Sequence, residues 1–89
     1  MSQLPLYFGR ALRQLRESRG WSQEELAGRA DLNRTYVGEL ERGQAVASLV
    51  TLDKLSHALG ISVTVLLSHV ERISTLHVLR GVELTAIAC

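Results

Sequence analysis

The chain has 89 residues, of which 46% are apolar and 21% are charged, and its formal net charge is +1. These values suit one small globular domain and exclude a disordered or strongly basic chain. A domain of this size has little stability in reserve. Its sequence must therefore favour each local structure strongly, or its hydrophobic core must be enlarged by pairing with a partner. The single cysteine, Cys89, cannot form an internal disulfide, which excludes a disulfide-stapled secreted scaffold.

Several other classes lack support in the sequence. The first ten residues contain no basic segment followed by an apolar run, so we expect no signal peptide. No stretch approaches the ~18 uninterrupted apolar residues of a membrane span. His57, His69 and His77 lie in no ligand cluster, and no nucleophile elbow, phosphate loop or paired-carboxylate motif occurs. We therefore expect a cytoplasmic protein with no membrane contact, no metal, no cofactor and no enzymatic activity.

The first two elements are predicted to be helices. After Pro5, apolar residues recur at positions 8, 11, 12 and 15, which predicts a helix from about Leu6 to Ser18. Ser22 and Glu25 form an S-x-x-E capping box, which predicts that a second, short helix begins at Ser22. This helix is expected to end at Asp31.

The stretch DLNRTYVGELERG (31–43) predicts a third helix. Asn33 is a good N-cap, and Gly43 is a good stop. Val37 and Leu40 are three residues apart and are expected to face the core.

Ser48 and Ser62 are expected to cap a fourth and a fifth helix, which Gly60 separates. Their expected inner faces consist of Leu49, Leu52, Leu55 and Leu59 in the fourth, and Val63, Leu66, Leu67, Val70 and Ile73 in the fifth. After Ile73 the pattern weakens, because the remaining residues are rich in β-branched side chains and include an Arg-Gly pair that could turn. A strand, a hairpin and a further helix all remain open for this segment.

The second and third helices together have the helix-turn-helix plan, with about three residues between them. Ala27 is a small residue where the third helix would cross the second. Asp31 occupies the turn, and aspartate is among the residues that tolerate a left-handed conformation. With the Val37 and Leu40 anchor, these features at fixed offsets predict a helix-turn-helix within one domain.

The segment RGWSQEELAGRADLNRTYVGELERG (19–43) resembles the phage-repressor-like (Cro/repressor, Xre-type) helix-turn-helix family. The likeness continues through SLVTLDKLSHALGISVTVLL (48–67) and covers roughly residues 8 to 68. Within this family, the motif RTYVGELERG is similar to controller proteins of restriction–modification systems and to small bacterial repressors. The resemblance implies an all-α fold, with a compact five-helix lambda-repressor-like DNA-binding domain at residues 5–73. A short apolar C-terminal extension, strand or helix, would follow at 74–89.

The resemblance also implies roles for individual residues. Base-edge contacts are implied for one face of the third helix, namely Arg34, Thr35, Gly38 and Glu39, where Gly38 would allow close approach to the floor of the groove. Phosphate contacts are implied for Gln23, Asn33, Tyr36, Arg42 and Gln44. Arg16 would pair with Glu41 and tie the first helix to the end of the third. The chemistry agrees, because arginine can bind guanine in a bidentate manner and glutamate can accept from cytosine.

The charge distribution gives weaker support for DNA binding. Residues 1–43 contain seven arginines and six acids, and residues 44–89 contain three basic and three acidic residues. The loop at 44–48 has no basic residue. We therefore expect modest affinity per subunit and a salt dependence set by few phosphates.

The C-terminal extension would expose much apolar surface, which favours pairing of two chains. The residues expected to take part are Val70, Ile73, Leu76, Val78, Val82 and Leu84. Folding back onto its own domain is the alternative. A homodimer would place two recognition helices about 34 Å apart, in successive major grooves.

We therefore expect a sequence-specific transcriptional regulator that binds a palindromic or pseudo-palindromic double-stranded DNA operator as a homodimer. It would be encoded by a bacterium or a phage and associate with the nucleoid. Repression by covering a promoter and activation through RNA polymerase both remain open. The alternatives are an antitoxin that also binds a toxin, and a helix-turn-helix interaction module without DNA binding, which the low net charge favours.

Overall fold

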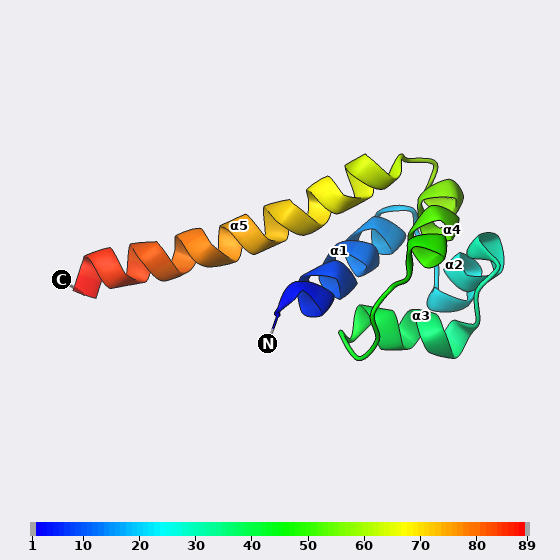
Figure 1. Ribbon diagram of the computed structural model, residues 1–89, viewed down its shortest axis with the longest axis horizontal. Helices are drawn as coiled ribbons and strands as arrows, with labels where there is room; N and C mark the ends of the chain where they lie inside the picture. The colour runs from blue at the N-terminus through cyan, green and yellow to red at the C-terminus, as the bar shows by residue number, and fades with distance from the viewer. Residues whose placement is uncertain (1, 89) are drawn as a thin grey trace.

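The computed structural model describes residues 2–88, with side chains through residue 79. This part of the chain forms five helices and no strand, namely α1 (Leu4–Ser18), α2 (Gln23–Ala30), α3 (Arg34–Glu41), α4 (Leu49–Leu59) and α5 (Val63–Ala88) (Figure 1). The all-α prediction is therefore confirmed, and α2 and α3 form the helix-turn-helix.

Capping side chains set where α2, α3, α4 and α5 begin, whereas α1 has no side-chain cap. The Ser22 hydroxyl accepts from the Glu25 amide at 3.1 Å, and Asn33 Oδ1 accepts from the Thr35 amide at 2.7 Å. Ser48 and Ser62 cap α4 and α5 in the same way. The carboxylate of Glu25 pairs with Arg29, one turn later, and does not turn back to Ser22. Only half of the predicted capping box forms, but the predicted helix start is confirmed.

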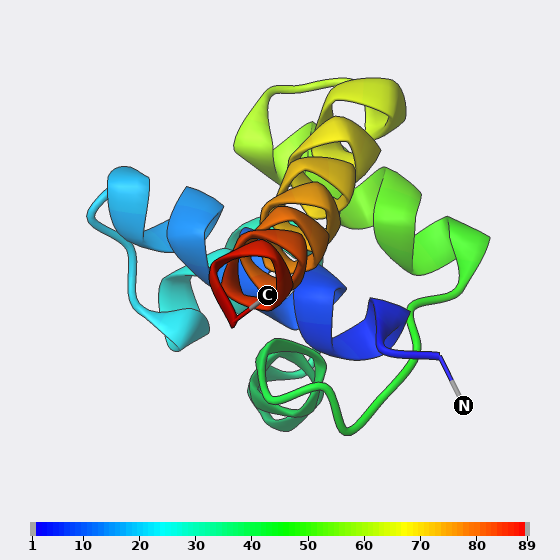
Figure 2. The ribbon, with the colours of Figure 1, turned by 90° about the vertical axis from the view of Figure 1, so that its left-hand side faces the viewer.

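The core is built around α1, which lies between α3 and α5 (Figures 1 and 2). Its residues Phe8, Ala11, Leu12 and Leu15 are buried, as their spacing predicts. Gly9 lies where α1 crosses the end of α3. A Cβ atom at this position would lie 2.5 Å from the carbonyl oxygen of Glu41 and would also overlap that of Leu40. Only glycine therefore lets the two backbones approach this closely.

The expected inner face of α4 needs one correction. Leu55 and Leu59 are buried and Leu52 is half-buried, but Leu49 is 83% exposed. Leu49 is the first residue of α4 and follows a surface loop, so its side chain lies beyond the edge of the core. Val50 beside it is exposed as well.

Helix α5 passes through residue 73 without a break and continues to residue 88, so the strand and hairpin alternatives for the extension are wrong. Leu66 and Val70 pack in the core, and the rings of Tyr7 and His77 lie 5.6 Å apart. Beyond this contact the helix leaves the domain (Figure 1). The Cα positions therefore extend 49 Å in one direction and 23 Å in the other two.

Membrane-spanning character is weak in the described residues. No single helix is long and apolar enough to cross a membrane. Helix α4 and the part of α5 that ends at Leu79 have enough length and apolar character only as a pair, and they are bent by 98°. Their buried leucines, Leu55, Leu59 and Leu66, belong to the domain core.

A buried ion pair joins three parts of the fold. The guanidinium of Arg16 donates to both carboxylate oxygens of Glu41, at 2.7 Å and 3.0 Å. It also donates to the Trp21 carbonyl at 2.8 Å, and the Gln23 amide donates to Glu41 at 3.0 Å. The side chains of Arg16 and Glu41 are only 12% and 3% exposed. The cluster therefore links α1, the start of α2 and the end of α3.

The hydrogen bond to Glu41 raises the pKa of Arg16 above its ordinary value, and this effect exceeds the opposing effect of burial. Because the pKa is raised in the folded state, the stability that this arginine contributes is complete at neutral pH. It is lost only as the pH rises through the folded-state pKa in the strongly alkaline range.

The turn between α2 and α3 depends on a left-handed residue. Asp31 has φ 53° and ψ 50°, and it is the only non-glycine residue with positive φ in the described chain. The left-handed turn predicted at this position is confirmed. Lys54 supports the turn by donating to the Asp31 carbonyl at 3.1 Å.

Substitution of Asp31 by glycine is expected to stabilise the domain by up to about 1 kcal/mol, because glycine adopts the left-handed conformation without strain. Asp31→Ala, which keeps the strain and loses the polar side chain, is expected to destabilise it. Urea unfolding of both variants measures the difference. Equal stability of the two variants would contradict this interpretation of the turn.

Substitution of Glu41 by leucine is expected to lower the free energy of unfolding by about 3–5 kcal/mol, because it leaves the charge of Arg16 buried and unpaired. The double variant Arg16→Met/Glu41→Leu is expected to regain much of this loss, because no buried charge remains. Urea unfolding of the single and double variants makes the comparison. A double variant that is less stable than Glu41→Leu would show that the pair acts in another way.

Candidate nucleic-acid interface

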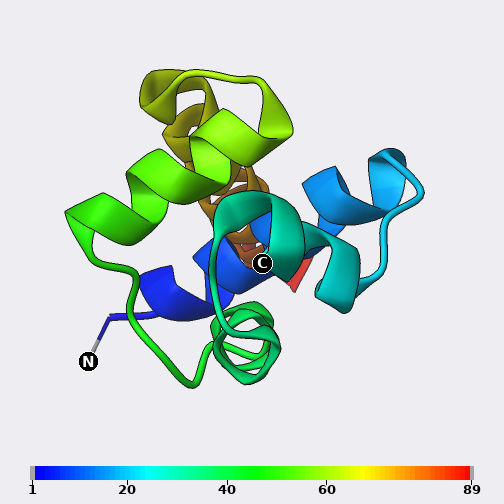
Figure 3. The same ribbon diagram turned by 90° about the vertical axis from the view of Figure 1, so that its right-hand side faces the viewer.

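Helix α3 forms one edge of the domain, on the far side of α1 from α5 (Figures 2 and 3). Its inner face carries the buried residues Val37, Leu40 and Glu41. Its outer face carries Arg34, Thr35 and Arg42, which are exposed, and Glu39, which is half-exposed. We call these four residues the α3 outer face.

The polar side chains at the N-terminal part of the α3 outer face have no partner among the described residues. In the described part of the chain, the side chains of Arg34, Thr35 and Glu39 make no hydrogen bond or ion pair. Arg34 and Glu39 are five residues apart, which is too far around the helix for a favourable pair. A free guanidinium, a hydroxyl and a carboxylate are therefore presented together from one rigid helix.

Gly38 does not lie on the open surface that was expected to approach the floor of a DNA groove. It is buried, and the atoms nearest to a Cβ built on it belong to side chains of the same domain. Arg42 Nη1 would lie 3.0 Å from that Cβ, and Gln23 Oε1 would lie 3.6 Å from it. The outer side of Gly38 is thus occupied by two residues that the sequence assigned to phosphate contacts.

The other residues assigned to phosphates lie around this region. Arg42 Nε donates to Gln44 Oε1 at 3.0 Å, so these two side chains form one unit. Asn33 uses its side-chain oxygen as the α3 cap. The hydroxyl of Tyr36 lies 3.2 Å from Thr51 Oγ1 and 3.4 Å from the Val46 carbonyl. Tyr36 therefore holds the loop after α3 against α4, in addition to any contact with a ligand.

The net charge of this surface is positive, although the formal net charge of the whole chain is only +1. Arg34 and Arg42 are exposed, and Glu39 is the one acid of α3 that has no ion-pair partner in the described residues. Glu41, the second acid of α3, is compensated by Arg16 beneath the surface.

Sequence reasoning missed several side chains that position the helices. Arg19 donates to the Leu59 carbonyl at 2.5 Å and joins α1 to the end of α4. The guanidinium groups of Arg29 and Arg19 lie 4.4 Å and 5.9 Å from the ring centroid of Trp21. The only available signal was the presence of arginines near a single tryptophan, which did not identify a specific contact.

The residues expected to form a dimer interface are not on one surface. Val70 is 2% exposed and belongs to the core of its own domain, and Ile73 is half-buried. Leu76 and Val78 are 53% and 58% exposed on the projecting part of α5. Val82 and Leu84 lie in α5, but their side chains are outside the described residues.

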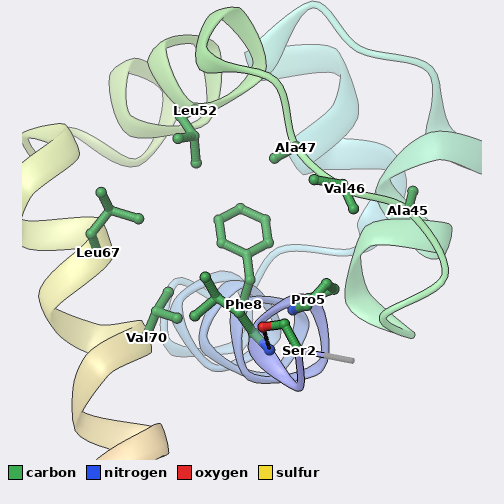
Figure 4. Close-up of a pocket in the computed structure, with 10 residues that line it drawn as sticks. Ser2, Pro5, Phe8, Ala45, Val46, Ala47, Leu52, Leu67 and Val70 are labelled. Carbon is green, nitrogen blue, oxygen red and sulfur yellow. Dashed lines mark hydrogen bonds between the residues drawn. The ribbon is translucent and has the colours of Figure 1, made fainter.

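A second apolar surface lies on the domain itself. Here α1, the loop before α4, α4 and α5 enclose an open cavity of about 370 Å³ around Phe8 (Figure 4). Leu52, Leu67 and Val70 line its α4 and α5 side, and Val46 lines its loop side. Val46 is 75% exposed, and Leu4, which also lines the cavity, is 56% exposed. No pattern in the sequence indicates this cavity.

Comparison with known proteins relates this arrangement to a family. A helix-turn-helix family profile matches residues 12–66. The control protein C.MunI of Mycoplasma sp is 41% identical over 73 residues, which are 81% of this chain and 99% of that protein. The control protein C.BamHI of Bacillus amyloliquefaciens is 47% identical over 57 residues, 63% of this chain and 70% of that protein.

Comparison with solved structures indicates the same family. The restriction–modification controller protein C.AhdI of Aeromonas hydrophila is 48% identical and has a TM-score of 0.68, over 70% of this chain and 94% of that one. The clp gene regulator ClgR of Corynebacterium glutamicum is 32% identical and has a TM-score of 0.84, over 94% of this chain and 88% of that one. The chain therefore belongs to the Xre-type helix-turn-helix family of DNA-binding transcriptional regulators, which are not enzymes.

Proposed function

We propose that this regulator binds a palindromic or pseudo-palindromic operator as a homodimer, with α3 in the major groove of each half-site. The observation that carries the proposal is the α3 outer face, where three polar side chains lie free on a short helix at the edge of the domain. An α-helix fits the major groove, and its N-terminal residues reach base edges first. Operator binding would place the protein at the nucleoid, in the cytoplasm of a bacterium.

Base reading is assigned to the side chains without partners. Arg34 is the first residue of α3, and its guanidinium can donate two parallel hydrogen bonds to a guanine. Thr35 can contact a thymine methyl group, and Glu39 can accept from a cytosine amino group. The carboxylate of Glu39 would also repel phosphates, which disfavours misplaced docking.

Backbone contacts are assigned to polar groups around α3, namely Gln23, Asn33, Tyr36, Arg42 and Gln44. The amides at the start of α3 favour phosphate oxygens because of the helix dipole. Only Arg42 in this set carries a positive charge, so a modest salt dependence is expected.

The proposed dimer uses the projecting part of α5. This segment exposes Leu76, Val78 and Leu79, and contact with the rest of the domain ends near His77. It lies on the far side of the domain from α3, so pairing there would leave both copies of α3 free. The apolar surface around Phe8 is the competing interface.

Replacement of Arg34 by alanine is expected to weaken specific DNA binding about ten- to hundredfold, because it removes one bidentate contact with a base. The probe is a duplex selected by the wild-type protein from a random pool, and the measurement is fluorescence anisotropy. Arg72→Ala is the matched control, because it removes the same charge from an exposed site on α5, far from α3.

Unchanged binding by Arg34→Ala would overturn the assignment of base contacts to α3. Equal losses for Arg34→Ala and Arg72→Ala would show that only overall charge matters. If the wild-type protein had no salt-dependent DNA affinity at about 50 mM salt, the interaction module without DNA binding would be favoured.

The double variant Leu76→Glu/Leu79→Glu is expected to be monomeric at concentrations at which the wild-type protein is dimeric, because four carboxylates would meet in the proposed interface. Sedimentation velocity measures the change. Val46→Glu is the control, because Val46 lines the Phe8 cavity and its side chain is 75% exposed. A monomeric Val46→Glu with a dimeric α5 variant would place the interface around the Phe8 cavity.

A further inference from the structure

Gly38 lies at the point where two polar side chains from different helices meet. Arg42, the C-cap residue that directly follows α3, has its guanidinium folded back over this glycine. Gln23, the first residue of α2, places its Oε1 near the same position. A methyl group on Gly38 would be 3.0 Å from Arg42 Nη1 and 3.6 Å from Gln23 Oε1. A contact of 3.0 Å is tighter than most contacts of a Cβ atom, so the guanidinium would have to shift by a few tenths of an ångström.

The Gln23 side chain is held in a fixed orientation. Its Nε2 donates one hydrogen to Glu41 Oε1 at 3.0 Å, and Glu41 is itself fixed by Arg16. An amide nitrogen of glutamine carries two hydrogens, so one remains for an outside acceptor. The buried ion pair thus determines where that hydrogen points.

The Arg42 side chain is oriented at its other end. Its Nε donates to Gln44 Oε1 at 3.0 Å, which leaves the terminal nitrogens to bind elsewhere. The free terminal N–H groups of the guanidinium and the second Nε2 hydrogen of Gln23 are donors, and the guanidinium adds one positive charge. Gln23 Oε1, the atom of Gln23 nearest to Gly38, is an acceptor and does not bind an anion. Phosphate oxygens are the acceptors that these donors would recognise.

We propose that Gly38 acts as a seat for Arg42, so that the guanidinium of Arg42 and the amide of Gln23 bind DNA phosphate as one pre-organised group. This inference rests on the proposed DNA-binding function and deepens it. It differs from the expectation that glycine is needed for close approach of the groove floor, because the space above Gly38 is filled by the protein itself. Pre-organisation of this kind raises affinity by reducing the ordering of side chains on binding.

The energetics of Gly38 make the proposal testable. No backbone atom of another element lies near its Cβ position, so alanine fits once the flexible guanidinium moves. Alanine is also the better helix former, so Gly38→Ala is expected to raise the melting temperature by roughly 2–6 °C. Gly28 in α2 provides the matched control, because a Cβ there meets nothing within 4 Å. A gain of stability is expected for both variants, and a loss of binding only for Gly38→Ala.

The test uses the full chain and a mixed-sequence 30-base-pair duplex, because phosphate contacts do not depend on sequence. Anisotropy is measured between about 50 and 200 mM NaCl. Gly38→Ala is expected to bind about three- to tenfold more weakly, with a salt slope smaller by about 1 for each subunit that loses one phosphate. Arg42→Ala is expected to show a similar loss, and Gly38→Ala is expected to add nothing in the Arg42→Ala background. Gly28→Ala is expected to bind as the wild type does.

A second measurement does not involve substitution of Gly38. If Gln23 and Arg42 act as one group, the loss in Gln23→Ala/Arg42→Ala is expected to be smaller than the product of the two single losses. Multiplicative losses would overturn the proposal. So would a Gly38→Ala variant that keeps full affinity, or one that loses affinity equally with and without Arg42.

The free protein gives a test that separates this inference from the proposed function. In NMR spectra without DNA, Gly38→Ala is expected to shift the Arg42 Nε–H and Gln23 Nε2 signals, and Gly28→Ala is not. If Gly38→Ala causes these shifts but the wild-type protein does not bind DNA, the proposed function is refuted and the placement of Arg42 over Gly38 still holds. DNA binding by the wild type without these shifts would refute the seat alone.

Discussion

The buried ion pair between Arg16 and Glu41 is the interaction on which the presentation of α3 depends. Two charges with little solvent exposure stabilise a fold only when their geometry is good and their remaining hydrogen-bonding groups are satisfied. Here the Trp21 carbonyl and the Gln23 amide complete the cluster, and the described side chains contain no buried polar atom without a partner. One cluster therefore sets the position of α3 and also orients Gln23 at the surface.

The local rules of the sequence account for most of the domain. Four capping side chains and the left-handed Asp31 determined the helix boundaries and the turn, and each acts through neighbours only a few residues away. The core of α1 followed from its apolar spacing, and the resemblance of residues 19–43 predicted the helix-turn-helix. These features could be read because each depends on a short segment of chain.

The remaining features depend on contacts between distant residues. The segment after residue 73 forms a helix although its β-branched residues favoured no single structure, because it continues an established α5. Leu49 has the spacing of a core residue but lies past the edge of the core. The sequence predicts an open surface at Gly38, because nothing in it shows that Arg42 folds back over this residue. Gly9 gave no signal at all, since its role exists only where α1 crosses α3.

The crossing at Gly9 has a mechanical consequence. Because the backbone of α1 approaches the carbonyl groups of Leu40 and Glu41 so closely, α3 cannot tilt or slide without carrying α1 with it. Helices α1 and α3 would therefore move together. On an operator, the DNA duplex would then have to deform more than the protein does. Base pairs that no side chain touches would therefore influence affinity through the ease with which they bend.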